Sequence, residues 1–321
     1  MIKILANDGL HPDGKLLLDE AEVEVDIVKH PQEDLAKVLL NYDGLIVRSA
    51  TKVRKELIDA VPNLKIIGRA GVGMDNIDVE YARSKGIHVF NTPGASSKSV
   101  AELTFAHIFS QARFLYQANR QMHVNGETEF TNLKKSYSKG ILLSGKKLGI
   151  IGFGRIGQEV AKIGIGIGMQ VYASDPYVDE GNIHFEIYDS GDVFLGIKVK
   201  TVPLERILEK CDIICVHVPL INKQAVIGRD EIARMKNGVI LVNTARGGVI
   251  DEDALLEALN SGKVAGAGLD VYVNEPKPRV DLLQHPNVSS TPHIGAETVE
   301  AQSFIGMELA EQIIDYFGLN P

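Results

Sequence analysis

The sequence predicts an α/β protein of two doubly wound domains, each built on a parallel sheet. Two observations predict this fold. Short apolar runs alternate with amphipathic stretches along almost the whole chain, and these runs fall into two successive series. Strands that alternate with helices form parallel sheets through right-handed crossovers, so each series predicts one sheet. The length of 321 residues also suggests about two domains.

The predicted strands are apolar runs bounded by glycine, proline or polar turn residues. The first series comprises residues 2–6, 23–28, 44–48, 64–69 and 87–91. The second series comprises residues 146–154, 169–175, 211–218, 238–244, 263–272 and 287–292. The amphipathic stretches between these runs predict the helices that cover the two sheets.

Two longer helical patterns determine the predicted domain boundaries. Residues 100–124 form one long helical pattern without glycine or proline, and it lies between the two series. Residues 297–317 form another after the last strand of the second series. Such helices can carry the chain between the domains and back. We therefore expect a discontinuous first domain, residues 1–98 plus 296–321, around a continuous second domain, residues 99–295.

The charge balance bears on the partners. Lysine and arginine number 34 against 42 aspartates and glutamates, and the formal net charge of −8 argues against nucleic acid or an anionic membrane as a partner. A small anionic substrate is still compatible, because local arginines and lysines can oppose the overall sign. No apolar run reaches the ~18 residues of a membrane span, and the N-terminus lacks a signal-peptide pattern. We therefore expect a cytoplasmic protein.

The two cysteines, Cys211 and Cys215, are too few for a disulfide framework in a chain of this length. Four residues apart on a predicted strand, they would point to the same face. We expect two small buried apolar residues here rather than a redox or metal pair. The sequence predicts no metal site elsewhere.

The stretch "LGIIGFGRIGQEVA" places Gly152, Gly154 and Gly157 directly after an apolar strand and at the start of a helix. In a dinucleotide-binding unit, such glycines permit a tight turn, close approach of the pyrophosphate, and close packing of helix on strand. The helix N-terminus offers N–H groups to the phosphates. Asp175, at the end of the next strand, can bind the ribose hydroxyls of NAD and repel the 2′-phosphate of NADP. The second domain is therefore predicted to be a Rossmann-like domain that binds NAD.

Seven stretches carry a resemblance to a known family: "LIVRSATKV", "IIGRAGVGMDNID", "VFNTPGASSKSVAELT", "IIGFGRIG", "VNTARGGVIDEDAL", "GAGLDVYVNEP" and "TPHIGAET". On these motifs the chain resembles the D-isomer-specific 2-hydroxyacid dehydrogenases over nearly its full length. Within that family it looks most like the D-3-phosphoglycerate dehydrogenases. The resemblance implies that the discontinuous domain binds the substrate, that residues 99–295 bind NAD, and that the active-site cleft lies between the two domains.

The resemblance also implies a catalytic trio at the matching positions: Arg246 of "NTARGG", Glu275 of "NEP" and His293 of "PHIG". Removal of a hydride from a secondary alcohol requires a base for the hydroxyl proton, and histidine titrates in the right range. A carboxylate beside the ring stabilises the imidazolium, and an arginine binds the substrate carboxylate or carbonyl oxygen. Each residue alone would more often be structural. Their joint placement at the ends of predicted strands favours catalysis.

The resemblance implies further contacts with NAD. The matching positions are Val72, Gly152, Gly154, Arg155, Ile156, Gly157, Asp175, His217, Val218, Pro219, Thr244, Ala245, Asp270, Gly295 and Ala296. An alternative role for Asp270 is that of an acid that caps a loop.

The resemblance assigns the two ends of the substrate to different groups. The backbone amides of Gly71, Val72 and Gly73 would help to hold the carboxylate, since glycines let the backbone approach an anion closely. A substrate phosphate would need further cations. The candidates are Arg48, Arg69, Lys134 and Lys135. We interpret the neighbouring Lys139 as part of a solvated face.

The implied activity is NAD-dependent oxidation of 3-phospho-D-glycerate to 3-phosphohydroxypyruvate, on the route to serine, by a homodimer. The nearest alternative is a glyoxylate or hydroxypyruvate reductase, or another D-2-hydroxyacid dehydrogenase. An alternative of a different class is a dinucleotide-sensing corepressor, against which the intact trio argues. Three features depart from the phosphoglycerate pattern. The chain has no tryptophan, residues 177–203 form a longer link that a hairpin could explain, and no C-terminal regulatory domain is expected.

Overall fold

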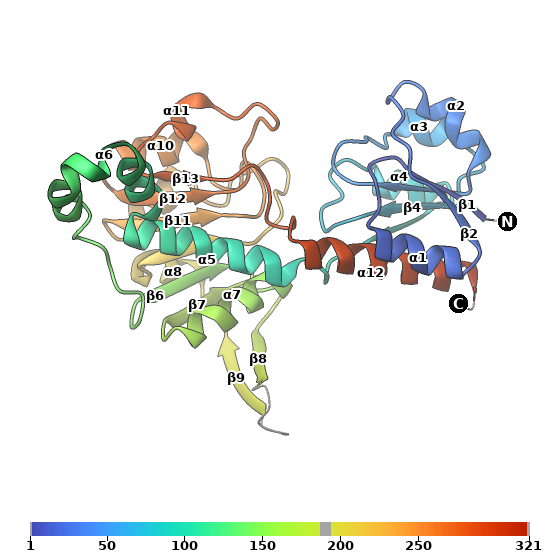
Figure 1. Cartoon of the computed structure of the whole chain (residues 1–321). Helices are drawn as coiled ribbons and strands as arrows, with labels where there is room; N and C mark the ends of the chain where they lie inside the picture. The colour runs from blue at the N-terminus through green and yellow to red at the C-terminus, as the bar shows by residue number, and fades with distance from the viewer. Residues whose placement is uncertain (1, 187–193, 320–321) are drawn as a thin grey trace. The chain divides into compact units, whose positions relative to one another are not determined.

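The computed structural model describes residues 2–186 and 194–319. The chain divides into two compact units, of which unit 1 comprises Met1–Ser97 with Ala296–Pro321 and unit 2 comprises Lys98–Gly295. Each unit is built on its own parallel sheet with helices on both faces (Figure 1). The predicted fold of two doubly wound, Rossmann-like domains is therefore confirmed.

Unit 1 contains a five-stranded parallel sheet in the order β2-β1-β3-β4-β5. Its strands are β1 (Ile2–Ala6), β2 (Val23–Asp26), β3 (Gly44–Val47), β4 (Ile66–Arg69) and β5 (His88–Asn91). Successive side chains of a strand face opposite sides of the sheet. Ile4 and Ile46 therefore join one apolar core, while Leu5 and Leu45 join the other.

The two cores of unit 1 are covered by different helices. The first is covered by α1 (Pro12–Glu20) and α12 (Val299–Phe317). The second is covered by α2 (Leu35–Val38), the 3-10 turn η1 (Leu39–Asn41), α3 (Lys55–Ala60) and α4 (Val79–Ser84). Helices α1 and α12 touch at Gly14 and Gly306, where a Cβ at Gly14 would lie 2.4 Å from the Gly306 carbonyl oxygen. Only glycine at position 14 permits this close crossing.

Unit 2 contains a six-stranded parallel sheet in the order β13-β12-β11-β10-β6-β7. Its strands are β6 (Lys147–Ile151), β7 (Gln170–Ser174), β10 (Ile213–Val216), β11 (Val239–Asn243), β12 (Val264–Leu269) and β13 (Val288–Ser290). The chain passes from β6 to β7 on one side and continues at β10 on the other side of β6. Open α/β sheets bind ligands at such a switch point, beyond the carboxyl ends of the strands.

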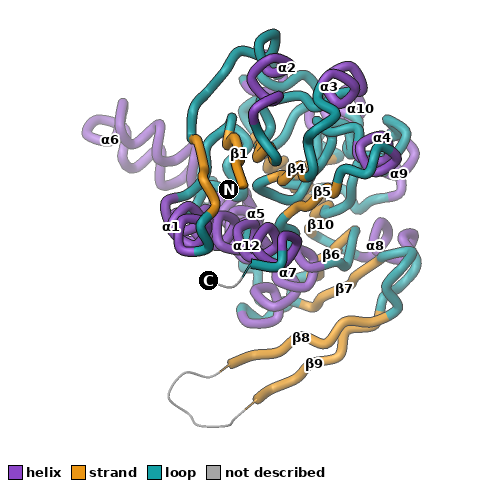
Figure 2. Tube along the Cα trace, turned by 90° about the vertical axis from the view of Figure 1, so that its right-hand side faces the viewer, coloured by secondary structure: helices purple, strands orange, loops and turns teal. Residues whose placement is uncertain are grey.

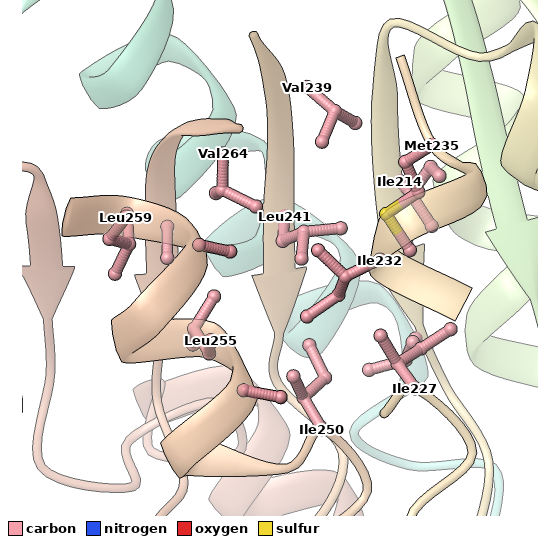
Figure 3. Packing of buried hydrophobic residues seen from close by; sticks show 14 of the residues in the cluster. Ile214, Ile227, Ile232, Met235, Val239, Leu241, Ile250, Leu255, Leu259 and Val264 are labelled. Atoms are coloured by element: carbon pink, nitrogen blue, oxygen red, sulfur yellow. The ribbon is translucent and has the colours of Figure 1, made fainter. Parts of the chain in front are cut away.

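Helices cover both faces of the unit 2 sheet. One face carries α8 (Leu204–Lys210), α9 (Arg229–Arg234), α10 (Glu252–Asn260) and α11 (Val280–Leu283), and the other carries α5 (Ser97–Arg113) and α7 (Arg155–Gly166). Figure 3 shows the first of these cores, where Ile232 of α9 and Leu255 of α10 pack with Leu241 of β11. Burial of such side chains is the main stabilising term for the sheet.

The prediction of a single helix over residues 100–124 was wrong. The structure divides it into α5 and α6 (Leu115–Ser136), because Phe114 between them adopts a left-handed backbone with φ of 56°. The chain returns after α6, where the Ile141 N–H donates to the Ala112 carbonyl at 2.9 Å and Tyr137 lies against Phe114. These later residues close the end of α5, and an apolar pattern alone cannot indicate such a closure.

The predicted arrangement of the two cysteines was also wrong. Cys211 is the residue that ends α8, and only Cys215 lies on strand β10. The two thiols belong to the cores on opposite faces of the sheet, because the chain turns between the helix and the strand. Both are buried free thiols.

Residues 177–203 contain an antiparallel pair of strands, β8 (Glu180–Glu186) and β9 (Phe194–Lys200), which Figure 2 shows beyond β7. The middle of the link, residues 187–193, lies outside the described residues. A Cβ at Gly181 of β8 would lie 2.7 Å from the ring of Phe153, which is fully buried. The link thus packs onto the glycine-rich turn. Among the described residues, no helix has the length and apolar character needed to cross a membrane.

Candidate active site

The glycine-rich turn connects β6 to α7 at the switch point of the unit 2 sheet. Gly152 has a φ of 94°, and a Cβ there would lie 2.6 Å from the His217 carbonyl oxygen. A Cβ at Gly157 would lie 2.1 Å from the Gly152 carbonyl oxygen. A Cβ at Gly154, in contrast, would meet no atom within 4 Å. Two glycines therefore serve the packing of the turn, and the third leaves an open approach to the start of α7, where backbone N–H groups can bind phosphate.

Asp175 lies beside this turn, at the end of β7. Its Oδ2 accepts a hydrogen bond from the Phe153 N–H at 2.7 Å, and its Oδ1 accepts one from the Tyr177 N–H at 2.8 Å. The acid predicted to bind ribose is thus held against the turn predicted to bind pyrophosphate. Both are parts of one dinucleotide-binding arrangement.

The segment His217–Pro219 follows β10, next to the glycine-rich turn. Both ring nitrogens of His217 are buried, and neither has a hydrogen-bond partner within the described part of the chain. Burial lowers the pKa of His217 to about 3, because a charged ring is poorly solvated there. The ring is therefore neutral at physiological pH.

His293 and Glu275 form a hydrogen-bonded pair in unit 2. Nδ1 of His293 lies 2.7 Å from Oε2 of Glu275, and Oε1 of Glu275 accepts a hydrogen bond from the Tyr272 N–H at 2.9 Å. The bond to Glu275 raises the pKa of His293, although partial burial opposes it. Burial would raise the pKa of Glu275, but the bonds from His293 and Tyr272 outweigh it and lower that pKa. A carboxylate next to a histidine with a raised pKa is suited to proton transfer.

Arg246 follows β11. Its charge adds to the lowering of the Glu275 pKa and opposes, without reversing, the rise in the His293 pKa. Its Nη1 donates to the Ala245 carbonyl at 2.7 Å. The loop is held by Asn243, whose side chain accepts from the Ala245 N–H at 3.0 Å and donates to the Arg246 carbonyl at 2.9 Å. The structure therefore brings the three predicted members of the trio into electrostatic reach of one another.

The loop that carries His293 is fixed from below by Asp270, which is almost fully buried. Oδ1 of Asp270 accepts from the Ile294 N–H at 2.9 Å, and Oδ2 accepts from the Gly295 N–H at 2.9 Å. His293 itself has a φ of 56°, an uncommon conformation for a residue other than glycine. The alternative role of Asp270, that of a loop-capping acid, is what these bonds describe.

The predicted substrate-binding residues of unit 1 already have protein partners. The Arg48 side chain pairs with Glu297, and the Arg48 backbone N–H donates to Oδ2 of Asp8 at 2.8 Å. Arg69 Nη1 donates to the Ala70 carbonyl at 2.9 Å. Arg48 and Glu297 line one surface pocket with Asp8 and Lys29, which also form an ion pair. Each cation at this pocket thus has a carboxylate beside it.

The glycine loop of unit 1 is held in a similar way. The Gly71 N–H donates to Thr92 Oγ1 at 2.8 Å, and the Val72 carbonyl accepts from the Asn91 side chain at 2.7 Å. The Gly71 N–H is therefore already bonded within the protein, and the role of Gly71, Val72 and Gly73 in carboxylate binding stays a prediction.

Lys134 and Lys135 lie in unit 2, in the last turn of α6, and both are exposed. Positively charged lysines in the last turn interact favourably with the negative end of the helix dipole, which gives them a local role without any ligand. Across residues 2–186 and 194–319, no group of three or more histidine, cysteine, aspartate or glutamate side chains is arranged to hold a metal ion.

Residues 105–295 match the family described as D-isomer specific 2-hydroxyacid dehydrogenase, NAD binding domain. The chain belongs to this family. The match includes the glycine-rich turn and all three residues of the trio. The protein is thus an NAD-dependent D-2-hydroxyacid dehydrogenase, and the predicted cofactor NAD is confirmed.

Three similar proteins illustrate the range of this family. The hydroxypyruvate reductase of Thermotoga maritima is 45% identical, and the alignment covers 99% of each chain. The D-3-phosphoglycerate dehydrogenase of Methanocaldococcus jannaschii is also 45% identical, but the dehydrogenase described here spans only 57% of its length. The solved structure of NAD-bound 3-phosphoglycerate dehydrogenase from Entamoeba histolytica has a TM-score of 0.77 at 30% identity, covering 99% of this chain and 95% of that chain.

The residues of this dehydrogenase fit NAD on structural grounds. The open space at Gly154 suits a pyrophosphate at the start of α7, and Asp175 lies next to it for the ribose. The sequence did not reveal Asn243 as the residue that holds the Arg246 loop. An asparagine at the end of a strand favours a turn, and that signal could have identified it.

Proposed function

We propose that this dehydrogenase interconverts a small D-2-hydroxy acid and its 2-oxo acid with His293 as the acid–base group. The geometry of the His293–Glu275 pair carries the proposal. Glu275 is an acceptor, so Nδ1 of His293 bears the hydrogen of their bond and Nε2 is the nitrogen that exchanges a proton. Bound NAD supplies the acceptor for the hydride. In oxidation, Nε2 takes the hydroxyl proton, and in reduction the imidazolium returns a proton to the carbonyl oxygen.

Glu275 and Arg246 support this proton transfer in different ways. Glu275 stabilises the imidazolium through its hydrogen bond and its charge. Arg246 would bind the substrate carboxylate or carbonyl oxygen through its guanidinium group. The bonds from Asn243 hold the Arg246 loop before substrate arrives, which reduces the ordering needed in the transition state.

We infer that the preferred substrate lacks a phosphate, with hydroxypyruvate and D-glycerate as the pair of choice. The ion pair between Arg48 and Glu297 supports this choice, because a phosphate would have to compete with an internal carboxylate. Lys29 is paired with Asp8 in the same way. The relative from Thermotoga maritima, named hydroxypyruvate reductase, matches along its whole length.

Oxidation of 3-phospho-D-glycerate, on the route to serine, is the second candidate. Arg48 and Arg69 lie at the positions that the resemblance assigns to a phosphate, and several relatives are named D-3-phosphoglycerate dehydrogenase. The test is kcat/KM with NAD for D-glycerate and 3-phospho-D-glycerate, and with NADH for hydroxypyruvate and glyoxylate. A kcat/KM for 3-phospho-D-glycerate more than about tenfold above that for D-glycerate would reverse the order of the two candidates.

We propose that the protein forms a homodimer through α6. This helix of 22 residues contains no buried residue, and Val124 and Phe130 on it are 76% and 58% exposed. Packing of this helix against a second copy of the chain would remove these apolar side chains from water. Replacement of both by aspartate should give a monomer in light scattering, whereas Leu195→Asp on β9, also exposed, should not.

The two buried free cysteines fit a reducing compartment such as the cytoplasm.

A further inference from the structure

Helix α5 contributes a buried histidine to the underside of the His293 loop. His107 is only 2% exposed. Its Nδ1 lies 3.0 Å from Oγ of Ser289, and its Nε2 lies 3.0 Å from Oγ1 of Thr291. Thr291 in turn donates to Oδ1 of Asp270 at 2.6 Å. These four side chains, from three separate parts of unit 2, form one continuous chain of hydrogen bonds.

The donor and acceptor of each hydrogen bond in this series follow from the chemistry of Asp270. Asp270 accepts backbone N–H groups through both oxygens, so the Thr291 hydroxyl must donate its single hydrogen to it. The Thr291 oxygen can then only accept from His107, which places the ring hydrogen on Nε2. Nδ1 is left to accept from the Ser289 hydroxyl. Burial lowers the pKa of His107, which agrees with a neutral ring.

The sheet makes room for this ring at a glycine. A Cβ at Gly268 of β12 would lie 2.5 Å from the His107 Cβ and 2.9 Å from its Cγ. Helix α5 can therefore approach β12 closely enough for the imidazole to reach Ser289 and Thr291. A buried histidine costs free energy unless its nitrogens are paired, and here both are.

We propose that His107 is a positioning residue for the His293 loop. His107 fixes Thr291, Thr291 fixes the Asp270 carboxylate, and this carboxylate holds the N–H groups of Ile294 and Gly295 that directly follow His293. Ser99 of the same helix adds a second anchor, because its hydroxyl donates to the Gly295 carbonyl at 2.6 Å. The inference rests on the proposed acid–base role of His293, whose left-handed backbone needs such support.

The test compares variants that keep or remove the hydrogen donated to Thr291. His107→Gln retains an N–H donor at nearly the Nε2 position. His107→Met removes this donor and replaces the ring by an apolar side chain of similar size. Ser289→Ala removes only the bond on the other side of the ring. Steady-state kcat and KM with hydroxypyruvate, the Kd for NADH and Tm are measured for each. A displaced reacting group can cost about a hundredfold in rate, so even partial loosening should be visible in kcat.

We expect His107→Met to lower kcat at least about tenfold with little change in the Kd for NADH, and His107→Gln and Ser289→Ala to stay within about threefold of wild type. Thr291→Val should repeat the loss, and it replaces the methionine variant where that variant does not fold. A kcat of His107→Met or Thr291→Val near wild type, or an equal loss in His107→Gln, would overturn the inference. His293→Asn is measured alongside, since full activity there would refute the proposed function itself and not only the role of His107.

Discussion

Nδ1 of His293 lies 2.7 Å from Oε2 of Glu275, and this contact raises the pKa of the histidine. Oxidation requires neutral His293, so its kcat/KM should rise as pH increases through that pKa, while reduction should be lost over the same range. Glu275→Gln removes the negative charge that stabilises the imidazolium and therefore lowers the pKa of His293. Both midpoints should then move to lower pH, and the maximal rate should fall. The measurement is kcat/KM against pH in both directions.

The matched control for this prediction is Glu252→Gln. Glu252 is a carboxylate of the same region, and it accepts a hydrogen bond from the Val273 N–H at 2.8 Å. Its replacement should leave the midpoint unchanged. Equal midpoints for Glu275→Gln and wild type would contradict the assigned pairing.

Replacement of His293 should remove the acid–base group. We choose His293→Asn, because asparagine tolerates the left-handed backbone at this position. The expected loss in kcat is at least about a hundredfold, since a positioned acid–base group supplies roughly 10²–10⁴ in rate. The Kd for NADH, followed by fluorescence titration, should change less than about threefold. Retention of most of the activity would assign His293 to a structural role.

The glycine-rich turn offers a paired test of cofactor binding. Gly154→Ala adds a methyl group in open space, so Tm should stay within about 2 °C while the Kd for NADH rises at least about tenfold. Gly157→Ala forces a contact with the Gly152 carbonyl oxygen, and strain of about 1–3 kcal/mol should lower Tm by about 2–12 °C. A Gly154→Ala protein that binds NADH normally would remove the pyrophosphate from this position.

Asp175 should determine the preference for NAD over NADP. Asp175→Asn removes the charge but keeps an oxygen that can accept from the Phe153 N–H. A charged hydrogen bond contributes about 1.5–3 kcal/mol, so the ratio of kcat/KM for the two cofactors should shift toward NADP at least about tenfold. Asp179→Asn, an exposed acid of the same segment, serves as the control. An unchanged ratio in Asp175→Asn would exclude contact with the ribose.

The Arg48–Glu297 ion pair makes a prediction about substrate choice. Glu297→Gln should release the arginine and raise kcat/KM for 3-phospho-D-glycerate relative to D-glycerate by about five- to tenfold. Glu300→Gln makes the same change of charge in the first turn of α12 and should leave the ratio unaltered. If both variants behave alike, Arg48 does not contact a phosphate.

Local patterns explain why so much of the fold could be predicted. Buried parallel strands are continuous apolar runs, and each run in the sequence coincides with a strand of one of the two sheets. The break at Phe114 could not be predicted, because it depends on Ile141 returning to the end of α5. The prediction that both cysteines face the same side of one strand failed for a similar reason. A turn between α8 and β10 places the two thiols in cores on opposite faces of the sheet, and this turn depends on the folded structure.

In the candidate site, too, local features were predicted and long-range ones were not. The glycine spacing and the acid after β7 could be predicted because they belong to one local unit of the chain. The hydrogen bonds that hold the His293 loop could not, because His107, Asp270 and Thr291 are separated by up to 184 residues and meet only in the folded unit. The sequence offered two roles for Asp270, a contact with NAD and the capping of a loop. Its bonds to the Ile294 and Gly295 N–H groups show the second role, and the contact with NAD stays a prediction.

The split composition of unit 1 has a consequence for the order in which the protein is made. Its five strands and α1 leave the ribosome first, but Ile305, Leu309 and Ile313 of α12 complete the core on one face of their sheet. About 200 residues separate the two parts, which at ~5–20 residues per second is a wait of roughly 10–40 s. During that interval the face later covered by α12 has no permanent cover, and a nascent chain at this stage should be a substrate for chaperones that bind exposed apolar surface.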